Sequence, residues 1–226
     1  MNENELKLLW QSTNEKLEES LIINKNNTDD IIRLKVQNFL SSMKPIKIFT
    51  LSIGILWVIV LGIVLVNFFV NAYHNVSLFF IYSATIQVLL TAIAVGIYIN
   101  QLDLIYNIDF SKPVIVIQQK LSKLKLSTLT VTRILFLQLP VWTTFYWNEA
   151  MFEKGNLSLW VIQVIITLLF TYFSLWLFFN IKYENRNKRW FQFIFRGREW
   201  QPILQSMELI NRIQNYQDEE IENASH

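Results

Sequence analysis

Cysteine is absent from this 226-residue chain, and histidine occurs only at positions 74 and 226. Without cysteine the chain can form no disulfide, and it has neither a thiolate nucleophile nor a thiolate ligand for zinc or an iron–sulfur cluster. His74 and His226 each lack a second ligand at the spacing of a metal site. No phosphate-binding loop, dinucleotide fingerprint, nucleophile elbow or zinc-protease motif occurs. We therefore predict no catalytic residue, no metal site and no cofactor.

Charge is also scarce, since charged residues make up 17% of the chain and hydrophobic residues 52%, with a net charge of +2. The charges gather in the first 45 residues, between about 100 and 133, and after 181. Four long apolar runs lie between them. Membrane proteins distribute charge in this way, so the composition predicts an all-α, polytopic membrane protein.

Four segments are long enough to span a bilayer as helices, which takes roughly 20 mostly apolar residues. They cover residues 46–70, 77–99, 129–152 and 157–181. The third is weaker than the others because Arg133, Gln138, Pro140 and Glu149 interrupt it. Pro140 removes one backbone hydrogen bond and therefore predicts a kink within this span.

Lysine and arginine near the ends of the spans predict the orientation. The connection 71–76 contains neither, and 151–156 contains only Lys154. By the positive-inside rule, both termini and the middle loop are cytoplasmic. The acidic N-terminus has no early apolar run, so we expect no cleaved secretory signal and a first span that directs its own insertion.

The N-terminal region, residues 1–44, contains two amphipathic stripes. Residues of the first share one helical face and form the expected partner-binding surface: Leu6, Leu9, Trp10, Leu17 and Leu21. An Asn-rich stretch, INKNN, follows, and Thr28 is an expected N-cap for a second helix. The second stripe contains Ile32, Val36, Phe39, Leu40 and Met43. Together the stripes predict a helical hairpin before the transmembrane domain, residues 45–181.

Two further amphipathic helices are expected on the cytoplasmic side. In residues 112–127, Val114, Ile117, Leu121 and Leu124 share one face, flanked by lysines. A basic amphipathic helix between spans usually lies in the plane of the membrane interface, and docking on the other cytoplasmic helices is the alternative. Residues 200–218 predict a last helix in the C-terminal region, 182–226. Residues 1–44, 112–127 and 200–218 would then form a cytoplasmic helical cap.

The stretch NKRWFQFIFRGREW, residues 187–200, interleaves cations with aromatic side chains. Such a pattern can bind nucleic acid, but here it directly follows a span on the cytoplasmic side, which favours membrane lipids or intramolecular packing. A protein partner is the next alternative, and we expect no nucleic acid. Trp190, Phe191 and Phe195 would sink into the interface. The expected head-group contacts are Lys182, Arg186, Lys188, Arg189, Trp190, Arg196 and Arg198.

Polar residues near or within the spans allow two structural hypotheses. Asp103, after the second span, and Arg133, early in the third, are expected to form a structural ion pair. Uncharged polar residues more often form hydrogen bonds between helices than line a pathway. If they do line one, an oligomeric pore would have Gln87, Thr91, Gln138 and Thr143 facing a shared axis.

Two segments carry a resemblance to a known group of proteins. The N-terminus matches an ELKxLW pattern at residues 5–10, and the middle segment, IDFSKPVIVIQQKLSKLKL, matches IDxSxPVxxIQxKL. These patterns resemble a group of uncharacterised bacterial integral membrane proteins with four spans and no established activity. The resemblance implies a location in the bacterial inner membrane. It also implies a regulatory protein that works with a cytoplasmic transcriptional or signalling partner, in the manner of a membrane-bound anti-sigma factor.

These observations favour a non-enzymatic membrane protein with a regulatory or scaffolding role. Its N-terminal and C-terminal amphipathic helices would engage a cytoplasmic protein partner, because the two outer connections are too short to form a receptor domain. The alternative function is a homo-oligomeric channel or small-solute transporter. Substitutions on the first helix should abolish a partner-dependent activity, whereas a substitution at Gln87 should abolish flux.

Overall fold

The computed structural model describes residues 3–71, 76–147, 157–197 and 200–224, and helices are the regular secondary structure within them. For part of the helical residues, mainly among 3–26 and in 216–224, only the backbone is described. The long helices are α1 (Glu3–Asn71), α2 (Leu78–Tyr106), α3 (Val114–Phe136), α6 (Leu157–Asn180) and α8 (Gln201–Ala224). The short ones are α4 (Leu139–Thr144), α7 (Arg189–Ile194) and the 3-10 helix η1 (Tyr183–Asn185). The predicted all-α fold is confirmed.

Four helical stretches are long and apolar enough to cross a membrane. They are Asn27–Asn71, Leu78–Tyr106, Val114–Thr144 and Leu157–Asn180. Each contains one of the four predicted spans or most of it, except that residues 148–152 of the third lie outside the described part of the chain. These stretches indicate a multi-pass membrane protein.

The first helix corrects the predicted hairpin. Residues 1–44 form no hairpin in the structure, because α1 continues through the INKNN stretch and through Pro45 to Asn71. Asparagine costs less than about 1 kcal/mol in a helix, and the stretch contains no glycine or proline to end it. Pro45 costs about 3 kcal/mol, but Met43 and Lys47, two residues before and after it, are fully buried. Tertiary packing therefore holds the helix together across both expected breaks.

The middle amphipathic segment also differs from the favoured prediction. Residues 112–127 do not form a separate helix in the interface plane, because α3 continues without a break from Val114 to Phe136, into the third span. Its apolar face is buried against other helices of the chain, as the docking alternative predicts. The reason is that Val114, Ile117, Leu121 and Leu124 meet three other apolar surfaces of the same molecule.

These surfaces form one hydrophobic cluster, which we call the cap core. Burial of apolar side chains on this scale is the main stabilising term for a helical domain. The predicted stripes of the second N-terminal segment, the middle segment and the last helix thus pack together. The cap core consists of Ile32, Val36, Leu40 and Met43 of α1, Ile105 and Ile108, Val114, Ile117, Leu121 and Leu124 of α3, and Ile203, Ile210 and Ile213 of α8.

Polar contacts fix the geometry around the cap core. Arg33 of α1 donates hydrogen bonds to the carbonyl oxygens of Phe110 and Lys112, in the connection between α2 and α3. Gln118 of α3 donates to Asn211 of α8 over 3.1 Å. Hydrogen bonds at the edge of the cap core thus join α1 to the connection between α2 and α3, and join α3 to α8.

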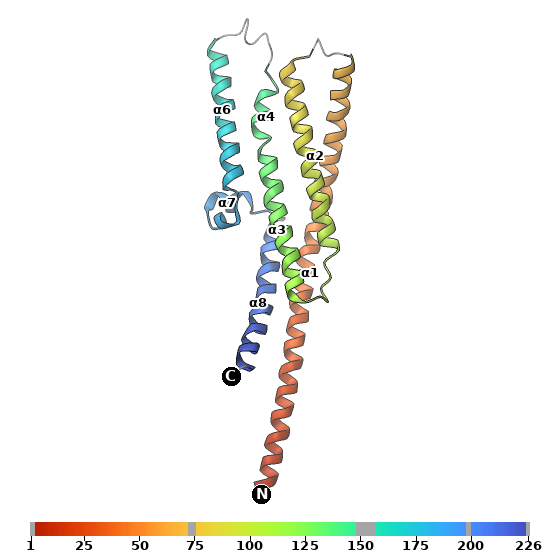
Figure 1. Ribbon diagram of the computed structural model, residues 1–226, viewed down its shortest axis with the longest axis vertical. Helices are drawn as coiled ribbons and strands as arrows, with labels where there is room; N and C mark the ends of the chain where they lie inside the picture. The colour runs from red at the N-terminus through yellow and green to blue at the C-terminus, as the bar shows by residue number, and fades with distance from the viewer. Residues whose placement is uncertain (1–2, 72–75, 148–156, 198–199, 225–226) are drawn as a thin grey trace.

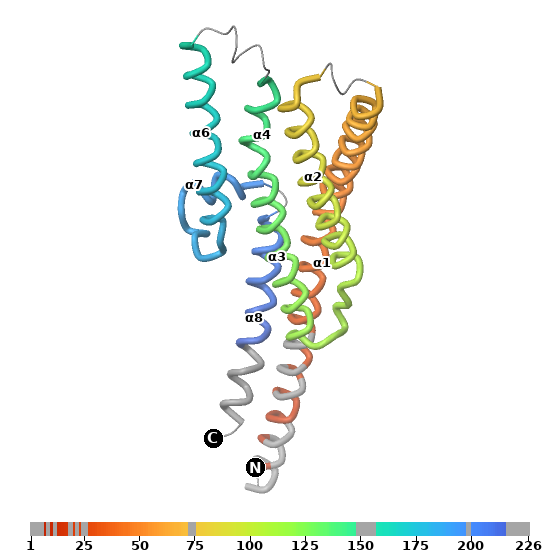
Figure 2. The backbone as a smooth tube through the Cα atoms, turned by 45° about the horizontal axis from the view of Figure 1, so that its top comes forward, coloured from red at the N-terminus to blue at the C-terminus, as the bar shows by residue number. Residues whose placement is uncertain are grey.

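The membrane part is a row of helices. Figures 1 and 2 show α2 between α1 and α4, and α4 between α2 and α6. The two outer helices, α1 and α6, are the most exposed. In their most apolar stretches, 6% of the residues of α1 and 11% of those of α6 are buried, against 28% for α2. Both termini and the connection between α2 and α3 lie at the same end of the row (Figure 1).

Gly54 of α1 lies close to α2, and of the described glycines it has the least room for a side chain. A Cβ atom at Gly54 would lie 2.9 Å from Cγ2 of Val95, which belongs to a stiff β-branched side chain. We expect Gly54→Leu to destabilise the protein by about 1–3 kcal/mol through overpacking. Thermal unfolding in mild detergent measures this. Gly62→Leu is the matched control, because a Cβ there meets no atom within 4 Å. Equal melting temperatures for the two variants would contradict the close approach.

Candidate functional site

A seam of polar side chains joins α2 to the third span. Ser83 and Thr144 share a hydrogen bond of 2.8 Å, and Gln138 donates to Thr91 over 3.0 Å. Gln87 lies between them on α2 and is fully buried, and its amide makes no hydrogen bond within the described part of the chain. The carbonyl of Thr143 accepts from Gln163 of α6 over 2.8 Å. The residues expected to face a shared axis therefore lie between helices of one protomer, which does not favour a pore between protomers.

The α-helix is interrupted at Leu137 and Gln138, between α3 and α4, just before Pro140, the residue at which a kink is predicted. Proline has no N–H, so the carbonyl of Phe136, four residues earlier, receives no helical hydrogen bond from it. Ser174 of α6 donates to this carbonyl over 2.9 Å. The kink is thus held by a neighbouring helix, as expected for a packing feature within a membrane.

The predicted ion pair between Asp103 and Arg133 does not form. Arg133 instead donates from Nε to the carbonyl oxygen of Ile181 over 2.6 Å, at the end of α6. Asp103 accepts from Asn107, the C-cap residue of α2, over 2.7 Å. Arg133 therefore ties α3 to the residue that follows α6. Its acceptor is a backbone carbonyl, which a search of the sequence for opposite charges does not find.

Lys47 is a buried lysine that belongs to none of the predicted sites. Its side chain is fully buried, and Nζ donates to Oε1 of Gln101 over 2.5 Å and lies 4.9 Å from the centre of the Tyr98 ring. A signal exists in the sequence, since Lys47 follows Leu40 and Met43 at intervals of seven and four residues, on the buried face of α1. Lys47 thus joins α1 to α2 where the cap core meets the membrane row.

The predicted partner-binding stripe lies on the N-terminal part of α1. Figure 1 shows α1 continuing beyond the end of α8, with no other labelled helix of the described residues beside it. The side chains of Trp10 and Leu17 are 68% and 57% exposed. Leu6, Leu9 and Leu21 lie on the same helix, but their side chains are outside the described part. The structure therefore leaves the two described members of the stripe uncovered.

This stripe does not continue the face that forms the cap core. An α-helix turns about 100° per residue, so the 19 residues from Leu17 to Val36 amount to about five turns and a further 100°. The stripe therefore faces about 100° away from the side of α1 that α8 covers. A longer α8 that kept to this side would lie beside the stripe and would not cover it. The exposed stripe needs a different covering surface.

The basic-aromatic segment is divided between the interior and the surface. Phe191, Phe195 and Trp200 are buried, and their ring centres lie 4.3 Å apart for the two phenylalanines and 4.8 Å for Phe195 and Trp200. They pack with Leu129 of α3, and with Leu177 and Ile181 at the end of α6. The expectation that Phe191 and Phe195 sink into the lipid interface is thus wrong, because the end of α6 and α3 offer a nearer apolar surface.

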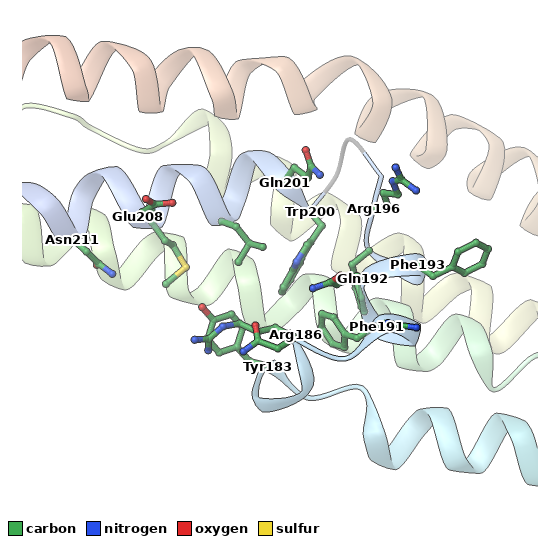
Figure 3. Close-up of a pocket in the computed structure, with 15 residues that line it drawn as sticks. Tyr183, Arg186, Phe191, Gln192, Phe193, Arg196, Trp200, Gln201, Glu208 and Asn211 are labelled. Atoms are coloured by element: carbon green, nitrogen blue, oxygen red, sulfur yellow. The ribbon is translucent and has the colours of Figure 1, made fainter.

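The outward side of this segment carries the cations. Lys182, Arg186, Lys188, Arg189 and Arg196 are exposed, and Arg198 lies outside the described residues. Trp190 is half-buried, with its ring centre 5.0 Å from that of Trp176 on α6. Phe193, by contrast, is 83% exposed and points away from the cluster (Figure 3).

A pocket of about 910 Å³ lies between this segment and the first turns of α8 (Figure 3). Its floor is aromatic, with Phe191, Phe195 and Trp200. Three arginines line it, Arg186, Arg189 and Arg196, and the carboxylate that lines it, Glu208, pairs with Arg212 over 2.8 Å. The pocket is therefore positively charged, and its size is within the range of small-molecule sites.

Tyr183, at the edge of this pocket, holds two cations against its ring. Nζ of Lys125, from α3, lies 3.9 Å from the ring centre, and Cζ of Arg186 lies 4.6 Å from it. Both cation–π contacts are within the usual range. Two like charges from different elements are thus gathered at one place.

Within the described residues, no group of three or more His, Cys, Asp or Glu side chains is placed to hold a metal ion. His74 and His226 lie outside this part of the chain.

Comparison of the chain with protein-family models, with curated protein sequences and with solved structures gives no match. The resemblance to bacterial four-span membrane proteins therefore has no support from these comparisons. The chain itself shows four long apolar helices with a helical cap core.

Proposed function

We propose that this multi-pass membrane protein is a non-enzymatic regulatory or scaffolding protein whose N-terminal helix engages a cytoplasmic protein partner. The observation that carries the proposal is the exposure of Trp10 and Leu17 on a part of α1 with no other labelled helix of the described residues beside it. Exposed apolar side chains at helical spacing are typical of helices that bind a groove or a second helix. The apolar face of α8 is occupied by the cap core, so the proposal rests on α1 alone.

The proposed orientation has the cap core and both termini in the cytoplasm of a bacterial cell, with the membrane row in the inner membrane. The supporting observation is that the lysines and arginines around the cap core and α7 lie at one end of the row, whereas the connection 71–76 has none. A partner for α1 would then be a cytoplasmic protein that presents an apolar groove or helix.

Substitutions on the exposed stripe should remove this partner without unfolding the protein. We expect Leu17→Asp and Trp10→Ala to reduce a stoichiometric co-purifying protein by tenfold or more, because a central aromatic or aliphatic anchor often contributes about 2 kcal/mol or more to binding. The measurement is native purification in mild detergent, with the masses of the whole particle and of its components. Lys16→Asp is the matched control, because it places a carboxylate at a neighbouring exposed position and changes the net charge by two units rather than one, so it is the more demanding test of charge alone.

Two outcomes would contradict the proposal. If Leu17→Asp and Lys16→Asp retain the co-purifying protein equally, the stripe is not its binding surface. If no second protein is present and Leu17→Asp halves the particle mass, the stripe instead joins copies of this chain, and the homo-oligomer alternative gains support.

A further inference from the structure

We propose that the basic-aromatic pocket binds the phosphate of an anionic phospholipid as a specific site, with the phosphate near Tyr183. The cations come from two separate parts of the chain, since Lys125 belongs to α3 whereas Arg186 and Arg189 belong to the segment after α6. The tertiary structure brings them together. A phosphate group is the ligand that such a cluster of guanidinium groups and an ammonium group recognises.

The charges around the pocket are not neutralised within the described part of the protein. Arg186, Arg189, Arg196 and Lys125 form no ion pair with a described carboxylate, and Glu208 is paired with Arg212. Glu184 of η1 is exposed and forms no ion pair there either. Lys125 and Arg186 both lie against the Tyr183 ring and repel each other, and the ring compensates for only part of this repulsion. A bound anion shared by both would remove it.

The position of the pocket favours a lipid over a soluble phosphate compound. The segment begins directly after α6 ends at Asn180, and the contact between Trp190 and Trp176 holds α7 beside the end of that candidate span. Figure 1 shows α7 beside this end of α6. Phe193 is exposed next to the pocket, and exposed aromatic side chains beside cations are typical of the interface between membrane and water. Acyl chains of a bound lipid would extend along α6.

The test uses the full-length protein in mild detergent, with binding of phosphatidylglycerol measured by native mass spectrometry. Phosphatidylcholine, which is zwitterionic, is the reference lipid. We expect one phosphatidylglycerol to bind at least tenfold more tightly than phosphatidylcholine. Arg186→Gln and Arg189→Gln should each weaken phosphatidylglycerol binding about tenfold, since each removes a charge-assisted hydrogen bond.

Lys188→Gln is the matched control, because it removes an equal charge from an exposed residue of the same segment that does not line the pocket. If Lys188→Gln weakens binding as much as Arg186→Gln, the cations act only as a diffuse surface charge, and the specific site is overturned. Equal binding of the two lipids overturns it as well.

Glycerol 3-phosphate distinguishes the source of the phosphate. If it binds as tightly as phosphatidylglycerol, the ligand is a soluble phosphate compound and the lipid assignment is overturned. Melting temperatures within about 2 °C of the unaltered protein would exclude unfolding as the cause.

Discussion

Replacing Ile117 with alanine is expected to destabilise the protein by about 2–5 kcal/mol, which is the usual cost of truncating a fully buried isoleucine. Ile117 lies on α3 in the middle of the cap core and has no exposed surface. Its removal leaves a cavity between α1, α3 and α8, and the surrounding helices cannot close it completely, because α1 and α3 continue into the membrane row. The melting temperature in mild detergent should fall by about 5 °C or more.

Ile115→Ala is the matched control for this prediction. Ile115 lies two residues earlier on the same helix and is 54% exposed, so its truncation should change the free energy of unfolding by no more than about 0.5 kcal/mol. A similar fall in melting temperature for both variants would mean that burial in the cap core is not the cause of the lost stability. A large fall for Ile117→Ala alone would show that the amphipathic part of α3 is a structural element of the cap.

Replacing Phe191 with alanine is expected to cost about 3–5 kcal/mol, because it deletes a buried aromatic side chain from the cluster around the end of α6. The Phe191 ring contacts both Phe195 and Trp200, with ring centres 4.3 Å and 5.8 Å away. Since the same rings form the floor of the pocket, the variant should also lose phosphatidylglycerol binding. Thermal unfolding and native mass spectrometry measure the two effects on one preparation.

Phe193→Ala separates the packing of this segment from its contact with lipid. Phe193 is 83% exposed, so its truncation should leave the melting temperature in detergent unchanged within about 2 °C. The variant should bind less well to lipid, because it loses an interfacial side chain. If Phe193→Ala destabilised the protein as much as Phe191→Ala, the two positions would not differ in burial, contrary to the structure.

The amphipathic stripes illustrate how far sequence reasoning reaches. Ile32, Val36, Leu40 and Met43 were expected on one face, and so were Val114, Ile117, Leu121 and Leu124, and both sets are buried in the cap core. Helical periodicity predicts these faces because it depends only on residues within a few turns of each other. It does not predict which face meets which, so periodicity alone does not decide between an in-plane helix at 112–127 and docking on the other helices.

The basic-aromatic segment shows the opposite case. Its sequence alternates cations and rings, and no local pattern separates Phe191, which is buried, from Phe193, which is exposed. The difference arises because α7 turns one face toward Leu129, Leu177 and Ile181, residues that are distant in sequence. The cation cluster at Tyr183 has the same origin, since Lys125 reaches it from α3.

The membrane class of this protein follows from its amino-acid sequence. Composition and local spacing are enough to find four apolar stretches of sufficient length. They also show that cysteine and known catalytic motifs are absent from the sequence. The tertiary structure alone decided that α1 is one helix through Pro45, that Arg133 binds the carbonyl of Ile181 rather than Asp103, and that Lys47 is buried beside Gln101. The physical reason is that hydropathy and periodicity depend only on residues close together in the sequence. The contacts of Arg133 and Lys47 join residues about 50 positions apart, and the helix at Pro45 depends on tertiary packing that offsets the unfavourable free energy of proline in a helix.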